Sequence, residues 1–160
     1  MHPRARELID RLGLEPHPEG GMFRRTFQSS LRVDPGDSRG PRAALTAIYY
    51  LLADGGISRW HRVASDEAWH WCEGAPLELF TASADCMIVR RELGPLSDRA
   101  VPQHVVAAGD WQAARSTGEY SLVGCCVGPG FDFADFSLLA TLPVQERPIL
   151  APAELLAEFL

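Results

Sequence analysis

Residues 55–74 read GGISRWHRVASDEAWHWCEG and concentrate imidazole, carboxylate and indole side chains between glycines. Five residues separate Gly55 from His61, and five more separate His61 from Glu67. Another six lie between Glu67 and Gly74. His and Glu are the usual side chains for moving protons at neutral pH. This stretch is therefore where the sequence predicts chemistry.

The chain on both sides of this stretch alternates short apolar runs with clusters of Gly, Pro, Asp and Ser. Runs rich in β-branched and aromatic residues predict about ten strands. They cover residues 22–28, 45–52, 57–63, 67–72, 77–81, 87–92, 104–106, 111–114, 121–127 and 136–140. Amphipathic patterns predict short helices at residues 4–12 and 153–160, and residues 34–41 form the one long loop. We expect an all-β antiparallel sandwich or barrel with short N- and C-terminal helices.

The composition of the chain indicates how many domains it forms and which kinds of partner it is expected to bind. The 160 residues, 46% of them hydrophobic, suit one domain with a single core. A net charge of -6 and 15 scattered basic residues, all Arg, argue against nucleic-acid binding. No apolar run approaches the roughly 20 residues that span a bilayer, and the start lacks the apolar core of a signal peptide, so we expect no membrane partner and a cytoplasmic location.

Four cysteines without Cys-x-x-Cys spacing are expected to be reduced and mostly buried.

Side chains alternate across a strand, so Arg59 and His61 are expected to share one face of their strand. By the same rule Glu67, Trp69 and Trp71 share a face, and His70 lies on the opposite one unless a bulge intervenes. If residues 64–66 form a hairpin turn, His61 and Glu67 lie close across it.

Two interpretations of these residues remain open. His61 and Glu67 form either a proton-transfer pair or a mutually satisfied pair in the core. Trp69 and Trp71 either belong to the core or form an aromatic wall for a sugar ring or small organic acid.

The spacing in residues 55–74 resembles the first motif of the cupin barrels, whose full form has a second His two positions after the first. Val63 occupies that position here. Residues 106–112 are similar to the second cupin motif, with Gln112 in place of its His. A metal would have His61, Glu67 and Gln112 as ligands, with His70 or His104 added only by a register shift. One His, one Glu and one amide fall short of a catalytic zinc or iron site, so we expect no metal cofactor.

A closer resemblance is to the DUF985 or cupin-5 family of small single-domain cupins. It rests on residues 14–24, 47–52, 61–70, 109–114 and 120–136, in the expected order. The resemblance implies a jelly-roll barrel, or double-stranded β-helix, with residues 1–160 forming a single cupin domain. It also implies a homodimer, an internal pocket and often an incomplete set of metal ligands, but no general activity.

Two residues near the start of the family pattern are further candidates for the pocket. Glu19, in a Glu-Gly-Gly turn, is either a pocket carboxylate or a loop carboxylate that caps backbone groups. Arg24 on the following strand either pairs with Glu19 or binds an anionic group of a ligand.

Three functions follow from these residues, each with a small polar or sugar-like metabolite as partner. The leading hypothesis is an isomerase or epimerase in which His61 is the base, Glu67 orients it, and Gln112 and Arg59 donate to an enolate oxygen. The alternative is a non-catalytic ligand-binding or storage-like cupin. A metal-dependent oxygenase is the least favoured.

Overall fold

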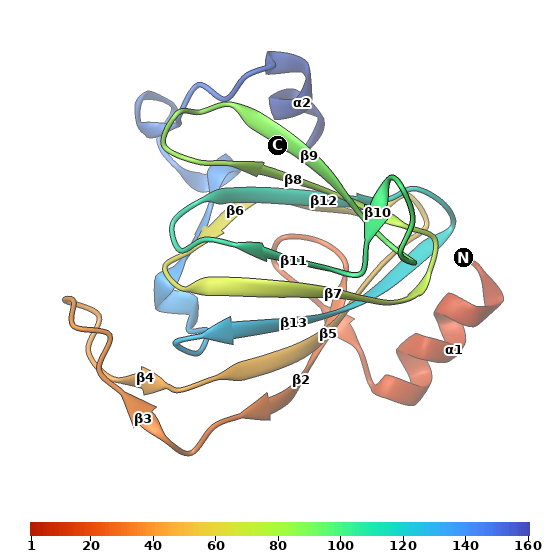
Figure 1. The fold of residues 1–160 in the computed structure, drawn as a ribbon, viewed down its shortest axis with the longest axis horizontal. Coiled ribbons are helices and arrows are strands. Elements are labelled where there is room, and N and C mark those ends of the chain that lie inside the picture. The colour runs from red at the N-terminus through yellow and green to blue at the C-terminus, as the bar shows by residue number, and fades with distance from the viewer.

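The computed structural model describes residues 1–160 and contains two six-stranded sheets that face each other (Figure 1). The first sheet has the order β1-β2-β5-β13-β7-β11, with every neighbouring pair antiparallel. Its strands are Glu15–Pro16 (β1), Met22–Gln28 (β2), Thr46–Ala53 (β5), Tyr120–Gly128 (β13), Asp66–Gly74 (β7) and Gln103–Val106 (β11).

The second sheet has the order β10-β9-β8-β12-β6-β14, and only its β10–β9 pair is parallel. Its strands are Ala100–Val101 (β10), Ile88–Leu93 (β9), Leu77–Ala82 (β8), Trp111–Ser116 (β12), Ile57–Val63 (β6) and Phe136–Leu138 (β14). A separate pair, Arg32–Val33 (β3) and Arg42–Ala43 (β4), projects beyond the sheets in Figure 1 and encloses the loop predicted at residues 34–41.

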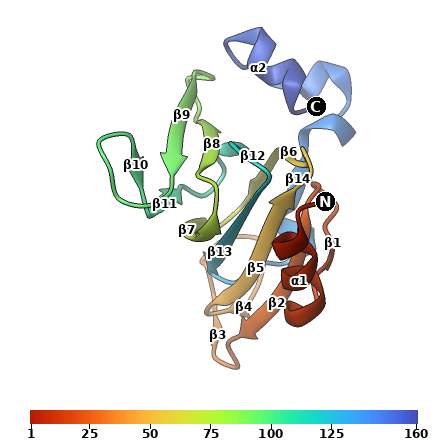
Figure 2. The same ribbon diagram turned by 90° about the vertical axis from the view of Figure 1, so that its right-hand side faces the viewer.

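Two helices lie outside the sheets, α1 at Pro3–Leu12 and α2 at Ala153–Glu158. Gly13 ends α1 in the left-handed conformation, at φ 62°, where glycine has no steric penalty. Figure 2 shows α1 against the sheet that contains β2 and β5, and α2 at the far end beyond β8 and β12. Neither helix has the length and apolar character needed to cross a membrane.

The predicted strands are all present, with ends shifted by at most two residues, and both predicted helices form. The expected hairpin across residues 64–66 is wrong. β6 and β7 follow each other in the chain but belong to different sheets, so they face across the barrel instead of pairing. Four two-residue strands, β1, β3, β4 and β10, were too short for a periodic pattern to reveal.

The core between the sheets follows the alternation of side chains along the strands. Tyr50, Trp69, Leu79 and Val123 point inward, with ten buried residues in this cluster. Tyr50 and Trp69 of this cluster also line the pocket, so the pocket lies directly against the inner core. Buried polar side chains, Glu19, His61 and Glu67, complete its lining.

Candidate functional site

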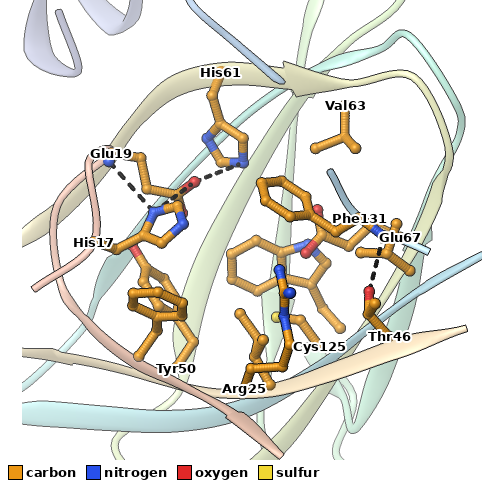
Figure 3. A pocket seen from close by; sticks show the side chains of 14 residues that line it. His17, Glu19, Arg25, Thr46, Tyr50, His61, Val63, Glu67, Cys125 and Phe131 are labelled. Carbon is orange, nitrogen blue, oxygen red and sulfur yellow. Dashed lines mark hydrogen bonds and ion pairs between the residues drawn. The ribbon is translucent and has the colours of Figure 1, made fainter. Parts of the chain in front are cut away.

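A pocket opens between the two sheets beside the inner core, whose residues Tyr50, Trp69 and Cys125 line it (Figure 3). Its empty volume is about 520 Å³, counted out to the open mouth, and only a small part of it admits the centre of a water molecule. The enclosed part of the pocket therefore has room for only a few water molecules. Fourteen residues line it: His17, Glu19, Phe23, Arg25, Thr46, Ile48, Tyr50, His61, Val63, Glu67, Trp69, Cys125, Val127 and Phe131.

Glu19 is the centre of the polar network on one wall. Its Oε2 lies 3.2 Å from His61 Nε2 and 3.4 Å from His17 Nδ1, and its Oε1 accepts a hydrogen bond of 2.8 Å from the Ser58 hydroxyl. The Glu19 side chain is only 7% exposed. The loop before β2 therefore delivers a buried carboxylate to the imidazole of β6, and Glu19 belongs to the pocket.

The hydrogen bonds of His61 determine where its protons lie. Nδ1 is 2.8 Å from the carbonyl of Arg59, which can only accept, so Nδ1 carries a proton. Nε2 then faces the Glu19 carboxylate, and this contact is favourable only with a proton between the two atoms. His61 and Glu19 thus share one proton, and both imidazole nitrogens have partners within the protein.

Glu67 lies on the facing wall and is held by Gln112. The indole N–H of Trp69 donates to Gln112 Oε1 at 2.9 Å. Because an indole N–H can only donate, this contact fixes the amide orientation and turns Gln112 Nε2 toward Glu67 Oε2, at 2.6 Å. Three residues from β7 and β12 therefore form a directed chain that ends on one oxygen of Glu67.

The two buried carboxylates differ in their proton affinity. Burial alone would raise the pKa of Glu19, but the charge of nearby His61 and the hydrogen bond with His17 outweigh it and hold that pKa below 4.5. Burial raises the pKa of Glu67 above 4.5, because the attraction of His61 and the amide of Gln112 compensate only in part. One pocket therefore contains a carboxylate that favours ionisation and another that favours its proton.

Of the residues expected from the sequence to form the site, Glu19, His61, Glu67 and Trp69 line the pocket, and Gln112 lies directly behind Glu67. Arg59 instead holds the loop before β2 in place, because its guanidinium donates hydrogen bonds to the carbonyls of Pro18 and Glu19. Trp71 packs at the edge of the inner core and donates to the carbonyl of Ala75.

Three other candidates lie outside the pocket. Arg24 is exposed and pairs across the sheet with exposed Tyr49, whereas Arg25 pairs with Ile48, and these two line the pocket. His70 is not among the lining residues, and His104 accepts a hydrogen bond from Arg91 outside the barrel. The alternation along β2 thus selects Arg25 over Arg24.

Sequence reasoning missed several lining residues, above all His17, Arg25 and Tyr50. His17 stands two residues before Glu19 and touches its carboxylate, so the His-x-Glu spacing was an available signal. Tyr50 donates to the carbonyl of Gly20 at 2.9 Å and anchors the same turn. All four cysteines are free thiols, but the expectation that most are buried is wrong: only Cys125 is buried, Cys86 and Cys126 are partly exposed, and Cys72 is exposed.

The residues of this pocket do not fit the metal of a typical cupin. No group of three or more His, Cys, Asp or Glu side chains has a geometry that could hold a metal ion. Val63 offers no ligand atom, and the oxygen of Gln112 already accepts from Trp69 while its amide nitrogen donates to Glu67. Both amide atoms of Gln112 are therefore used in hydrogen bonds within the protein, and neither Val63 nor Gln112 supplies a free ligand atom at the position of a cupin His.

Comparison with known proteins places the chain in a family. Residues 6–139 match the family described as Cupin superfamily (DUF985). A hypothetical protein from Leishmania major has 30% identity and a TM-score of 0.80, over 97% of this chain and 96% of that one. A protein from Shewanella oneidensis has 35% identity and a TM-score of 0.75, over 82% of each chain.

More distant structures share the fold alone. KdgF from Halomonas sp. has 14% identity and a TM-score of 0.55, over 78% of this chain and 94% of that one. A search of curated proteins gave no match. The fold is the expected double-stranded β-helix, and the chain belongs to the DUF985 (Cupin_5) branch of the cupin superfamily.

Proposed function

We propose that this cupin binds a small polar metabolite in the barrel pocket and isomerises or epimerises it by proton transfer. One observation carries the proposal: a single pocket holds two buried carboxylates in different surroundings. Glu19 accepts from Ser58 and lies against His61, which lowers its pKa, whereas Glu67 has only the neutral amide of Gln112 as a donor, and burial raises its pKa. Environments that separate two titratable groups in this way are typical of acid and base pairs in enzymes.

Glu67 is the proposed base. Gln112 donates to its Oε2, and its Oε1 takes part in no bond within the chain, so Oε1 is available to a ligand. A raised pKa makes this carboxylate a stronger proton acceptor than an exposed Glu. It would remove a proton from a carbon next to a carbonyl group, leaving an enolate.

His61 and Glu19 are the proposed acid. They share a proton at an Nε2 to Oε2 separation of 3.2 Å, which is longer than the roughly 2.7–2.9 Å of a tight ionic hydrogen bond. An enolate oxygen placed beside Nε2 would accept that proton in part and be stabilised by it. For an isomerisation, Glu67 returns its proton to the neighbouring carbon while the hydroxyl group of the first carbon gives its proton back to Nε2 of His61. For an epimerisation, Nε2 of His61 delivers its proton to the opposite face of the same carbon, and the proton left on Glu67 exchanges through solvent to restore the pair of His61 and Glu19.

These roles reverse those expected from the sequence. The sequence favoured His61 as base and Glu67 as its orienting carboxylate. In the structure Glu19 orients His61, and Glu67 faces the pair from the other sheet.

Proton exchange in D₂O tests the proposal. Small hydroxy acids and sugars are incubated with the protein, and replacement of carbon-bound hydrogen by deuterium is followed by NMR. Glu67→Gln keeps the acceptor for Gln112 but removes the base, so exchange should fall by about 100-fold or more. Glu15→Gln, an exposed acid on β1, is the matched control and should exchange at the wild-type rate.

One observation favours a second candidate, a non-catalytic binding protein. Both nitrogens of His61 are bonded within the protein, as in a satisfied structural pair. In that case metabolites bind without any isotope exchange. Binding without exchange, or an exchange rate that Glu67→Gln leaves unchanged, would contradict the proposed reaction.

A further inference from the structure

A second hollow adjoins the pocket and has a more polar lining. It has an empty volume of about 510 Å³ and is lined mainly by polar residues from β2, β3, β4 and the segment before β14. Its lining residues are Arg25, Gln28, Arg32, Arg42, Ala43, Gly130, Phe131, Asp132 and Phe133. Three of the 15 arginines of a chain with net charge -6 thus meet in one groove.

The groove adjoins the barrel pocket. Arg25 and Phe131 line both hollows. Figure 3 shows Arg25 extending from β2 toward the middle of the pocket, on the side facing His61 and Glu67. A ligand whose reacting part lies beside Glu67 therefore has its other end within reach of the groove.

Charge in the groove is only partly neutralised. Arg42 is held by Asp135 through two hydrogen bonds of 2.8 Å, so this guanidinium is already paired. Arg25 makes one hydrogen bond, to the Gln28 amide oxygen, and Arg32 makes one, to the Pro41 carbonyl.

Neither Arg25 nor Arg32 has a carboxylate partner, so each keeps unused N–H donors and a full charge. Asp132, the one acid in the lining, accepts from the backbone N–H of Ala134 and balances one of the two charges. A net positive charge and free donors remain.

The structure points to an anionic ligand, and we propose that this groove binds a phosphate or carboxylate group of the metabolite, with Arg25 and Arg32 as donors. Guanidinium groups recognise both kinds of anion through paired N–H donors. The inference rests on the proposed function only for the statement that the other end of the ligand reacts in the barrel. It narrows the substrate class to acidic metabolites, and Arg25 becomes a residue that determines specificity.

Titration with simple anions tests the groove directly. Inorganic phosphate and malonate are titrated into the full-length protein at constant ionic strength, and the backbone amide signals of residues 28–32 and 130–133 are followed by NMR. Saturable shifts confined to these residues are expected, and the tighter of the two anions identifies the chemical group. Uniform or unsaturable shifts with both anions would overturn the proposal.

Three variants separate the groove from a general effect of charge. Arg25→Gln and Arg32→Gln should each weaken binding of the preferred anion by about 10-fold, as expected for loss of a charged hydrogen bond. Arg24→Gln is the matched control, because Arg24 is exposed on the same strand and lines neither hollow. An equal loss in Arg24→Gln would refute the site.

The failure of the groove and the failure of the proposed reaction can be told apart. If anion binding depends on Arg25 but no metabolite exchanges deuterium, the proposed reaction is refuted and the proposed anion site is supported. If Arg25→Gln still catalyses exchange with an unchanged KM, the proposed anion site is refuted and the proposed reaction is supported. If both hold, Arg25→Gln raises KM far more than it lowers kcat.

Discussion

Glu19 and Glu67 lie in the same pocket and differ in what their neighbours donate. Glu19 receives hydrogen bonds from the Ser58 hydroxyl and shares a proton with His61, whereas Glu67 receives only the neutral amide of Gln112. Ionising a buried carboxylate is costly unless cations or several donors surround it. Both carboxyl groups are buried, so the difference in their hydrogen-bond donors makes the pKa of Glu19 lower than that of Glu67.

Glu19→Gln should destabilise the protein at pH 7 by about 1.5–3 kcal/mol, because it removes the buried charge that accepts from the Ser58 hydroxyl and lies against His61. The pKa of Glu19 is lowered in the folded state, so its contribution is present above 4.5 and is lost as the pH falls through the lower folded pKa. Urea unfolding gives the free energy of unfolding at pH 7, where Glu19 contributes fully, and below pH 4, where its contribution is being lost. A loss in Glu19→Gln that is the same at both pH values would contradict the ion pair.

Glu67→Gln should show the opposite pH dependence. The pKa of Glu67 is raised, so its favourable contribution is present below 4.5 and is lost as the pH rises through the higher folded pKa. The variant keeps an oxygen for Gln112 but has no charge to bury. Relative to wild type it should gain stability between pH 4.5 and pH 8, measured by urea unfolding. A constant difference across that range would show that Glu67 ionises as an exposed Glu does.

At the scale of elements, the strands could be predicted from the sequence, because the pattern of residues that identifies each strand lies within the strand itself. β2 and β6 begin and end at the residues that the pattern gave. The partner of β6 could not be predicted, because a two-residue connection between β6 and β7 suits both a hairpin and a change of sheet. The sheet order decides between them through contacts with β12 and β14, which lie far along the chain.

Helix α1 is fixed to the first sheet by one polar contact beside its apolar face. Arg4 donates to both oxygens of Glu73 on β7, at 2.7 and 2.9 Å, and Tyr120 donates to the same carboxylate. The hydrogen bond with Arg4 lowers the pKa of Glu73 from 4.5 to about 2. The contact is therefore complete above pH 4.5 and is lost as the pH falls toward 2.

Arg4→Gln should loosen α1 without opening the barrel. Amide exchange at pH 7 is expected to become severalfold faster in α1 and to stay unchanged in β13, because the helix end opens locally. Arg11→Gln is the control, since Arg11 contacts only Glu7, on the exposed face of the same helix. Faster exchange in β13 would mean that the contact stabilises the whole fold instead.

At the scale of the whole molecule, the barrel is covered on the outside by its own C-terminus. Phe159 is fully buried against Trp60 and Phe80, and its carbonyl accepts from the backbone N–H of Trp60. Phe159→Ala should cost about 3–5 kcal/mol in unfolding free energy through the cavity it leaves. Leu160→Ala, at an exposed position, should cost little. Equal effects of the two substitutions would show that α2 does not pack as described.

The site could be predicted only where its residues are close in the sequence or follow a family pattern. His61, Glu67 and Trp69 lie within one motif, and their inward faces follow from alternation. The contact between Glu19 and His61 joins residues 42 positions apart on different elements, so only the folded chain reveals it. The homodimer implied by the family resemblance stays a prediction, to be measured as the mass in solution.

One barrel pocket holds two buried carboxylates, and their surroundings shift the two pKa values in opposite directions. An NMR titration of the side-chain carboxyl carbons, assigned with Glu19→Gln and Glu67→Gln, measures both pKa values. Glu67 is expected to titrate above 4.5 and Glu19 below it. Two carboxylates that titrate together near 4.5, or in the reverse order, would contradict this expectation.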